Sequence, residues 1–226
     1  MKKKIVAIIP ARGGSERIKN KNIKKIYNKP LLVWTILAAQ KSKLVDEIYV
    51  TSDNDKILKI AKKCGVNCIL RPQKLSNNTI MPDAAVLHAF QKIGKIFDYI
   101  VTLQPTSPLR QATDIDRAIS EIIKEKGDSL LSAFKTHAFM WEKKKYTCKA
   151  NYNIFKRPRS QDSERYQENG SIYVTKPKIF IKNKNRLGGK IIISEMERYA
   201  SLDIDSFEDF KIAELILKLR RGSIEN

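Results

Sequence analysis

A short loop with several cations follows the first apolar run of the chain. Residues 5–9 are Ile-Val-Ala-Ile-Ile, and Arg12, Ser15 and Lys21 come soon after, around two consecutive glycines. Glycines let a backbone approach a ligand and present N–H groups, and cationic side chains complement phosphate oxygens. The pattern predicts a polyphosphate-binding loop, although spacing alone is equally compatible with a solvated basic turn. It is neither a P-loop nor a Gly-x-Gly-x-x-Gly dinucleotide loop.

Two carboxylates lie close together near the end of the chain, in the sequence Asp203-Ile204-Asp205. In an extended segment, residues i and i+2 point the same way, so both could face one cation. Mg²⁺ is typically held by one or two carboxylates together with substrate phosphates. The alternative is that Asp205 caps the following helix and Asp203 is solvated. Because Ser206 can cap that helix instead, magnesium binding is the better interpretation.

Polar residues also follow other expected strands. Arg71 comes directly after one apolar run, and Gln104 after another; Asn22 lies in the first loop. In α/β sheets, ligands bind outside the carboxyl ends of the strands. An amide can match the adjacent donor and acceptor groups of cytosine, or a sugar hydroxyl. Taken singly, each of these would be an ordinary loop residue.

Apolar, β-branched runs alternate with amphipathic segments, which is typical of βαβ units. We expect strands at 5–9, 47–51, 66–70, 99–103 and 129–134, and helices at 30–40, 54–63, 82–92, from Thr113 as N-cap to about 123, and 206–221. The fold class is therefore α/β, with a mainly parallel, Rossmann-like sheet.

This alternation breaks from about residue 135 to 190, where charged and aromatic residues mix. We interpret this segment as an insertion that projects from a single domain spanning 1–226, with strands near 171–175 and 190–194.

The formal net charge is +20, which raises the possibility of nucleic-acid binding. Lysine dominates over arginine and is scattered along the chain, whereas base recognition depends on bidentate arginine contacts. Nucleic acid is therefore an improbable partner. The sequence has no apolar run long enough to cross a membrane and no evident secretory leader, so we expect a cytoplasmic location.

Several motifs together resemble the CMP-sialic acid synthetases, also called acylneuraminate cytidylyltransferases. The resemblance lies in Ile8-Ile9-Pro10-Ala11-Arg12-Gly13-Gly14-Ser15 with Lys19-Asn20-Lys21-Asn22, in Leu103-Gln104-Pro105-Thr106-Ser107-Pro108-Leu109-Arg110, in Arg159-Ser160-Gln161, in Asn169-Gly170-Ser171-Ile172-Tyr173, and in Asp203-Ile204-Asp205. Lys21-Asn22-Ile23 differs from the Gly-Lys-Pro-Leu that is usual in the related Kdo cytidylyltransferases, which favours the sialate branch.

The resemblance implies an enzyme that joins CTP to an acidic nine-carbon sugar, of N-acetylneuraminate or legionaminate type, releasing pyrophosphate. It implies a nucleotidyltransferase fold and a homodimer whose insertion reaches the partner's active site. Its site residues would be Arg12, Ser15, Lys21, Asn22 and Arg71 for the nucleotide, with Arg12, Lys21 and Asp205 acting in catalysis; Gln104, Arg159 and Tyr173 for the sugar; and Asp203 and Asp205 for Mg²⁺. The alternatives are a Kdo-type cytidylyltransferase and a non-catalytic, basic nucleic-acid-binding protein.

Overall fold

A mixed seven-stranded sheet forms the centre of the protein. We describe residues 2–15, 17–77, 81–159 and 164–222 of a computed structural model. Across the sheet, the strands are β11 (Ile191–Glu195), β7 (Ser129–Thr136), β10 (Arg165–Thr175), β6 (Tyr99–Leu103), β1 (Ile5–Pro10), β4 (Glu47–Ser52) and β5 (Asn67–Leu70). The pairings of β1 with β4 and β6, of β4 with β5, and of β11 with β7 are parallel, whereas β10 runs antiparallel to both of its neighbours. The predicted mainly parallel α/β sheet is confirmed.

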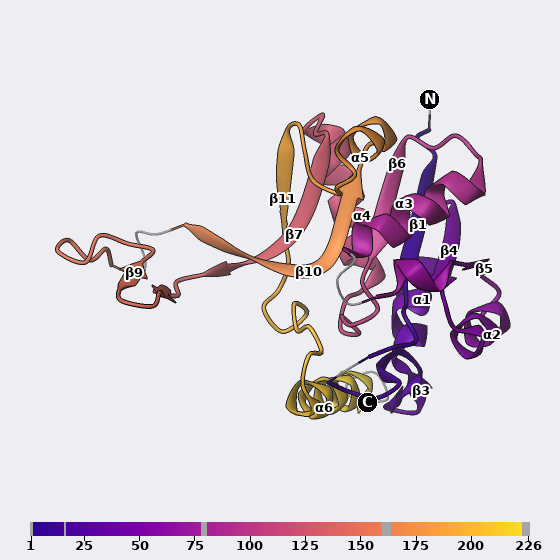
Figure 1. Cartoon of the computed structure of the whole chain (residues 1–226), viewed down its shortest axis with the longest axis horizontal. Coiled ribbons are helices and arrows are strands. Elements are labelled where there is room, and N and C mark those ends of the chain that lie inside the picture. The colour runs from indigo at the N-terminus through magenta and orange to yellow at the C-terminus, as the bar shows by residue number, and fades with distance from the viewer. Residues whose placement is uncertain (1, 16, 78–80, 160–163, 223–226) are drawn as a thin grey trace.

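Strand β1 lies inside the sheet, between β6 and β4, and all six of its residues are buried. Such a continuous apolar run suits a strand that helices cover on both faces. On one face lie α1 (Leu31–Lys41), α2 (Asp55–Lys63) and α4 (Ala112–Lys124), whose apolar sides pack with the main core. On the other face lie α3 (Pro82–Ile93) and α5 (Pro177–Asn183), around Val6, Val86 and Phe180. Figure 1 shows these layers.

The last helix, α6 (Phe207–Gly222), packs beside the loops that follow β1 and β6. Ile204, Phe210 and Leu217 share a small core with Ile18 and Leu109. The short strands β2 (Lys25–Ile26) and β3 (Lys29–Pro30) pair near this helix. Two 3₁₀ turns, η1 (Lys21–Ile23) and η2 (Gln73–Leu75), follow β1 and β5 in the chain. The C-terminal helix therefore fixes the acidic segment before it against the first loop.

Helix boundaries agree with the sequence patterns except at α4. The prediction that Thr113 caps this helix is wrong, since Thr113 lies inside it and Gln111 is the N-cap residue. The Asp114 carboxylate accepts a hydrogen bond from the Gln111 backbone N–H at 2.9 Å. An acidic residue at this third helical position satisfies the cap, which makes a threonine cap unnecessary.

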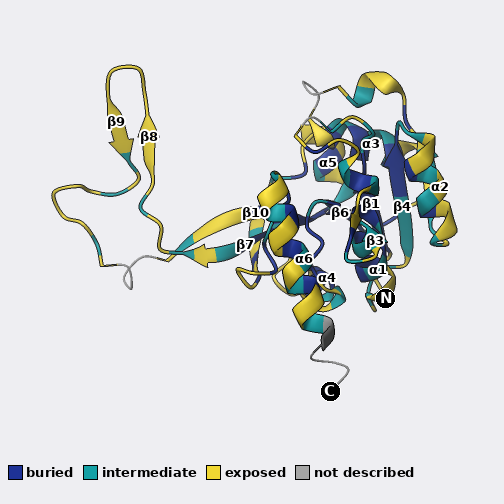
Figure 2. Ribbon diagram, turned by 90° about the horizontal axis from the view of Figure 1, so that it is seen from below, coloured by how far each residue is buried: buried dark blue, intermediate teal, exposed yellow. Residues whose placement is uncertain are grey.

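The segment 135–190, expected as an insertion, divides into two parts. Its second part belongs to the sheet: β10 lies between β6 and β7, and β11, just after the segment, forms an edge. Its first part leaves the body as an arm, which carries the hairpin of β8 (Trp141–Lys143) and β9 (Cys148–Ala150). The outer ends of β7 and β10 stay paired from Glu168–Ala133, where Ala133 is buried, out to Arg165–Thr136, and they carry this arm outward. Figure 2 shows the arm as a mostly exposed projection.

Within the residues described, no helix combines the length and apolar character needed to span a membrane.

Candidate functional site

A cleft of about 480 Å³ opens at the carboxyl ends of β1, β5 and β6. We refer to it as the first cleft. Seven of the expected site residues line it: Arg12, Ser15, Lys21, Asn22, Arg71, Gln104 and Asp205. Loops after three different strands supply most of them, because parallel strands end at the same edge of a sheet. The cleft's size is within the range of small-molecule sites.

The glycine loop after β1 is held against the end of β4. The Gly13 N–H donates a 3.0 Å hydrogen bond to Asp53 Oδ1. A Cβ at Gly13 would lie 2.8 Å from atoms of the Asn54 side chain, so only glycine fits this approach. Asn54 in turn is the N-cap of α2, accepting from the backbone N–H groups of Lys56 and Ile57. The loops after β1 and β4 therefore contact each other through the first residues that follow the two strands.

Lys21 joins the first loop to the acidic segment. Its Nζ donates a 2.6 Å hydrogen bond to the Ile204 carbonyl oxygen and lies 3.7 Å from Asp205 Oδ1. Arg17 approaches the other Asp205 oxygen at 3.3 Å. Two cations and one carboxylate thus share this part of the cleft, where a phosphate and a divalent cation could both find partners.

Asn22 is buried and has one orphaned polar atom. Its Nδ2 donates a 2.8 Å hydrogen bond to the Arg12 carbonyl oxygen. Its Oδ1 is buried and has no hydrogen-bond partner among the described residues. A buried acceptor without a partner costs about 1–3 kcal/mol. In a cleft-lining residue, an unpaired acceptor suits a ligand that offers an N–H or O–H donor.

Arg71 lines the first cleft with a nearly buried side chain. Its Nε donates to Ser76 Oγ at 2.8 Å and its Nη1 to the Thr51 carbonyl oxygen at 3.3 Å, while Nη2 lies 3.6 Å from Asp53 Oδ1. Burial lowers the pKa of this guanidinium, and Asp53 opposes that shift. These contacts fix the side chain and leave it little freedom to follow a ligand.

The Gln104 loop is held by a residue to which the sequence patterns assigned no role. Arg110, the last residue of that motif, is buried; its Nη1 donates to the Ser171 carbonyl oxygen at 2.8 Å, and both Nη atoms donate to the Gln104 carbonyl oxygen at 3.2–3.3 Å. Its Nη2 also donates to Thr35 Oγ1 at 2.8 Å. Burial lowers the pKa of Arg110. In the sequence, the one feature that points to this role of Arg110 is its position at the end of a proline-containing loop.

The two aspartates face different clefts. Asp205 lines the first cleft, whereas Asp203 lines a second cleft of about 590 Å³. Ile204 between them is fully buried, and its N–H donates to the Thr106 carbonyl oxygen at 2.9 Å. Part of Asp203 is open to solvent, but protein packed around its carboxyl raises its pKa, and the Asp205 charge adds to this shift. The carboxylates are thus close enough to repel each other, which a shared cation would relieve.

Two oxygen-donating carboxylates at the boundary of the clefts fit Mg²⁺, which prefers such ligands and completes its shell with phosphates and water. The described residues contain no group of three or more His, Cys, Asp or Glu side chains arranged to hold a metal.

Tyr173 lines the second cleft rather than the first. Its hydroxyl donates to Glu168, and the Arg186 guanidinium stacks over its ring at 4.4 Å. Arg186 is itself paired with the buried Asp83 at 2.7 Å. Burial, together with Glu168, raises the pKa of Tyr173. The tyrosine is therefore a neutral, firmly held wall of this cleft.

Arg159 lines neither cleft. It is exposed on the arm, beyond β9, and Ser160 and Gln161 of its motif lie outside the described residues. Near it, Arg157 stacks on Phe139 at 4.3 Å, and Phe139 and Trp141 both pack edge-on against Tyr152. Within one subunit the arm thus holds Arg159 away from the other candidate residues.

The fold is that of an α/β nucleotidyltransferase. The structure of a CMP:2-keto-3-deoxy-manno-octonic acid synthetase complexed with CTP superposes with a TM-score of 0.73, at 15% identity, covering 96% of this chain and 99% of that one. A 4-diphosphocytidyl-2C-methyl-D-erythritol synthase superposes with a TM-score of 0.72, at 13% identity, over 96% and 99% of the two chains. These likenesses establish the fold.

Sequence comparison defines the family. The cytidylyltransferase family profile matches residues 6–220, so the chain belongs to the cytidylyltransferase family. It is 32% identical to the CMP-N,N'-diacetyllegionaminic acid synthase of Legionella pneumophila, covering 98% of this chain and 99% of that protein. It is 30% identical to the N-acylneuraminate cytidylyltransferase of Escherichia coli O18:K1:H7, over 94% of this chain and 52% of the relative. The chain thus spans about half the length of the acylneuraminate relatives and nearly all of the legionaminate one.

Proposed function

We propose that this protein transfers the cytidylyl group of CTP to a nonulosonic acid, an acidic nine-carbon sugar, and releases pyrophosphate. The observation that carries the proposal is the first cleft, in which Arg12, Lys21 and the orphaned Asn22 acceptor lie beside Asp205. The names of the relatives support the substrate class, since two of them act on N-acylneuraminate and on diacetyllegionaminate.

In the proposed reaction, the anomeric hydroxyl oxygen of the sugar forms a bond to the α-phosphorus. The bond from that phosphorus to the bridging oxygen breaks, pyrophosphate leaves, and the hydroxyl proton passes to a base. Arg12, Ser15 and Lys21 would hold the triphosphate, with Lys21 and Arg12 neutralising charge that develops on the phosphate oxygens. The Asn22 acceptor would receive a hydrogen bond from the cytosine amino group, and Arg71 would lie against the nucleoside.

Asp203 and Asp205 would hold Mg²⁺, which supplies charge neutralisation and Lewis acidity at the phosphates when it is bound. Because each aspartate faces one cleft, the pair would link the triphosphate in the first cleft to the sugar in the second. Gln104 and Tyr173 would contact the sugar from the two sides. Positioning of this kind is the main contribution that a protein makes to phosphoryl transfer.

We further propose a homodimer in which the arm of one subunit reaches the partner's clefts. The arm's exposed aromatic residues and its projection support this arrangement, and it would bring Arg159 to a sugar carboxylate. The cytoplasmic location expected from the sequence stays a prediction.

A pyrophosphate-release assay tests the proposal. The acids are N-acetylneuraminate, diacetyllegionaminate, pseudaminate and Kdo, each with CTP and Mg²⁺, and ATP, GTP and UTP serve as controls. We expect turnover with CTP and one nonulosonic acid. Turnover with Kdo alone would show a Kdo-type cytidylyltransferase instead of one that acts on nonulosonic acids. The absence of turnover with every acid would refute the proposal.

A further inference from the structure

The second cleft contains carboxylates that would repel an acidic sugar. Its lining includes the carboxylates of Glu168 and Asp203, and Arg198 is the one cationic residue among the described residues that line it. In the proposed function Mg²⁺ would offset the charge of Asp203, but the Glu168 carboxylate remains beside the ligand. A further cation in the lining therefore favours binding of an anion, because like charges at short range are strongly unfavourable. The cleft is open to solvent, and its lining combines apolar surface with polar side chains such as Gln167, Asn169 and Ser201. A few polar groups on a mainly apolar lining are typical of a small-molecule site.

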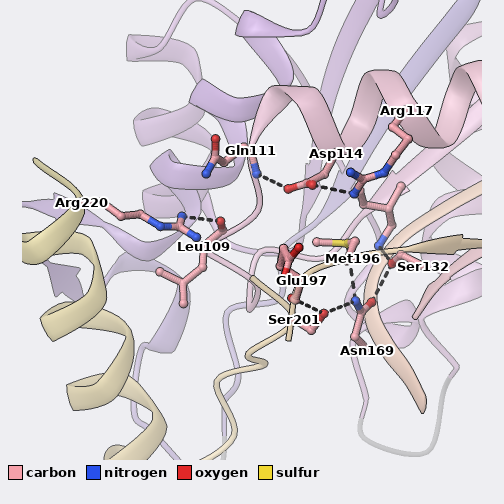
Figure 3. A network of polar contacts seen from close by, with 11 residues as sticks. Leu109, Gln111, Asp114, Arg117, Ser132, Asn169, Met196, Glu197, Ser201 and Arg220 are labelled. Carbon is pink, nitrogen blue, oxygen red and sulfur yellow. Dashed lines mark hydrogen bonds and ion pairs between the residues drawn. The ribbon is translucent and has the colours of Figure 1, made fainter. Parts of the chain in front are cut away.

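The turn that carries Arg198 is rigidly attached to the sheet. Asn169 Nδ2 donates to Ser201 Oγ at 2.8 Å, and that hydroxyl donates to the Glu197 carbonyl oxygen at 3.0 Å. The Met196 N–H donates to the Ala133 carbonyl oxygen at 2.7 Å, which ties the start of the turn to β7. Figure 3 shows Asn169 at the centre of this network, with Ser132 on one side and Ser201 on the other. The backbone under Arg198 is therefore preorganised.

The Arg198 side chain lies against an aromatic ring and has no ion-pair partner among the described residues. Its guanidinium lies 6.0 Å from the ring centroid of Phe134, which lines the same cleft. Among the residues that the structure describes, no carboxylate forms an ion pair with it. Arg186, also near the cleft, is instead committed to Asp83 at 2.7 Å. The guanidinium N–H groups of Arg198 are thus available to a ligand. Two of them can donate parallel hydrogen bonds to the two oxygens of a carboxylate.

We infer that Arg198 determines specificity for an acidic acceptor by binding the sugar carboxylate in the second cleft. The inference rests on the proposed function, and it assigns the carboxylate a partner within the same subunit. It explains how a cleft with two acidic residues can accept an anion. It also separates the two substrates: Arg198 recognises the acid, while the first cleft recognises the nucleotide.

The test compares steady-state constants for wild type, Arg198→Ala and Arg198→Lys, with the sugar acid accepted by wild type and with its neutral methyl ester. Lys211→Ala is the matched control, since Lys211 also lies over an aromatic ring, 5.0 Å from the Phe207 centroid, and lines neither cleft. CTP binding without sugar and the melting temperature are measured for each variant, which separates a structural defect from a recognition defect.

We expect Arg198→Ala to raise KM for the acid by about tenfold to a hundredfold, the effect of losing hydrogen bonds to a charged group. CTP affinity should change less than about twofold, and the preference for acid over ester should collapse. Lysine should restore part of that preference, because it keeps the charge without the fork. A wild-type KM and acid preference in Arg198→Ala, with pyrophosphate release intact, would overturn the inference and leave the proposed function standing. No turnover by wild type with any acid would overturn both.

Discussion

Lys21 and Asp205 come from opposite ends of the chain and meet in the first cleft, with 3.7 Å between Nζ and Oδ1. The same ammonium donates to the Ile204 carbonyl oxygen at 2.6 Å. The contact connects the loop after β1 to the segment before α6, so a phosphate-binding cation and a metal-binding carboxylate are positioned by each other. This pair is the point at which triphosphate and metal would meet.

Replacement of Lys21 should therefore impair the chemical step more than folding. We expect Lys21→Met to lower kcat by about 10²–10³, as for loss of one group that stabilises developing charge. The measurement is kcat at saturating CTP and sugar. Lys25→Met, at an exposed position on β2, is the control and should keep wild-type turnover. Equal kcat values for the two variants would remove Lys21 from the mechanism.

The unpaired Oδ1 acceptor of Asn22 should help the protein to distinguish CTP from UTP. Asn22→Ala should raise KM for CTP by about 2–12-fold, the range for one hydrogen bond. It should also narrow the preference for CTP over UTP, because uracil carries an acceptor where cytosine carries an amino donor. Competition between the two nucleotides measures this ratio directly. An unchanged ratio would mean that Asn22 only supports the loop through Arg12.

Gly13 and Gly14 make a matched pair. A Cβ at Gly13 would lie 2.8 Å from Asn54, whereas a Cβ at Gly14 meets nothing within 4 Å. Gly13→Ala should displace the Asn54 cap, cost about 1 kcal/mol of unfolding free energy and weaken CTP binding. Gly14→Ala should be close to neutral in both assays, which are urea unfolding and nucleotide titration. Similar losses in both variants would contradict the close approach of the two loops.

Metal dependence should be governed by the two aspartates. Removing Mg²⁺ with EDTA should abolish turnover, and readdition should restore it. In Asp203→Asn and in Asp205→Asn, we expect at least a tenfold higher Mg²⁺ concentration at half-maximal rate, since each variant loses one charged ligand. Asp55→Asn, an exposed residue at the start of α2, provides the comparison. A metal requirement unaltered in both variants would place the ion elsewhere.

The hydrogen bonds of the Asp98 carboxylate should make part of the folding stability depend on pH. Its carboxylate accepts from the Lys4 backbone N–H at 2.8 Å and from Lys3, and these contacts lower its pKa. A lowered folded-state pKa gives stability that is present above the unfolded value of about 3.9 and is lost as pH falls through the folded value. At pH 7 we therefore expect Asp98→Asn to unfold at a lower urea concentration than wild type. In strong acid the two proteins should unfold at the same urea concentration. A difference that persists in acid would point to packing instead of charge.

The strand-end residues could be predicted because parallel strands bring their carboxyl ends together, and this placed Arg12, Arg71 and Gln104 in one cleft. Other features depend on contacts between remote segments. Arg110 is buried because Thr35 and Ser171 supply acceptors that no local pattern reveals. Asp203 and Asp205 line different clefts, and the N–H of Ile204 between them donates to the Thr106 carbonyl oxygen, a long-range contact that the i, i+2 rule does not include.

The outer half of β10 could not be predicted either. Residues Arg165, Gln167 and Glu168 are polar and carry no apolar alternation, so the sequence predicts an insertion there and not a strand. Pairing with β7, at Thr136, Phe134 and Ala133, is what keeps them extended. The paired ends of β7 and β10 that carry the arm are thus an extension of the central sheet, whereas the β8–β9 hairpin forms a sheet of its own.

Mass spectrometry of the product formed from CTP, Mg²⁺ and a nonulosonic acid tests the central claim most directly. We predict a CMP ester of the sugar and one pyrophosphate for each ester, with both lost when EDTA removes Mg²⁺ and both reduced in Asp203→Asn at the Mg²⁺ concentration that half-saturates wild type. CTP hydrolysed to CMP without an ester, or no change in CTP with any acid offered to folded protein, would contradict the account.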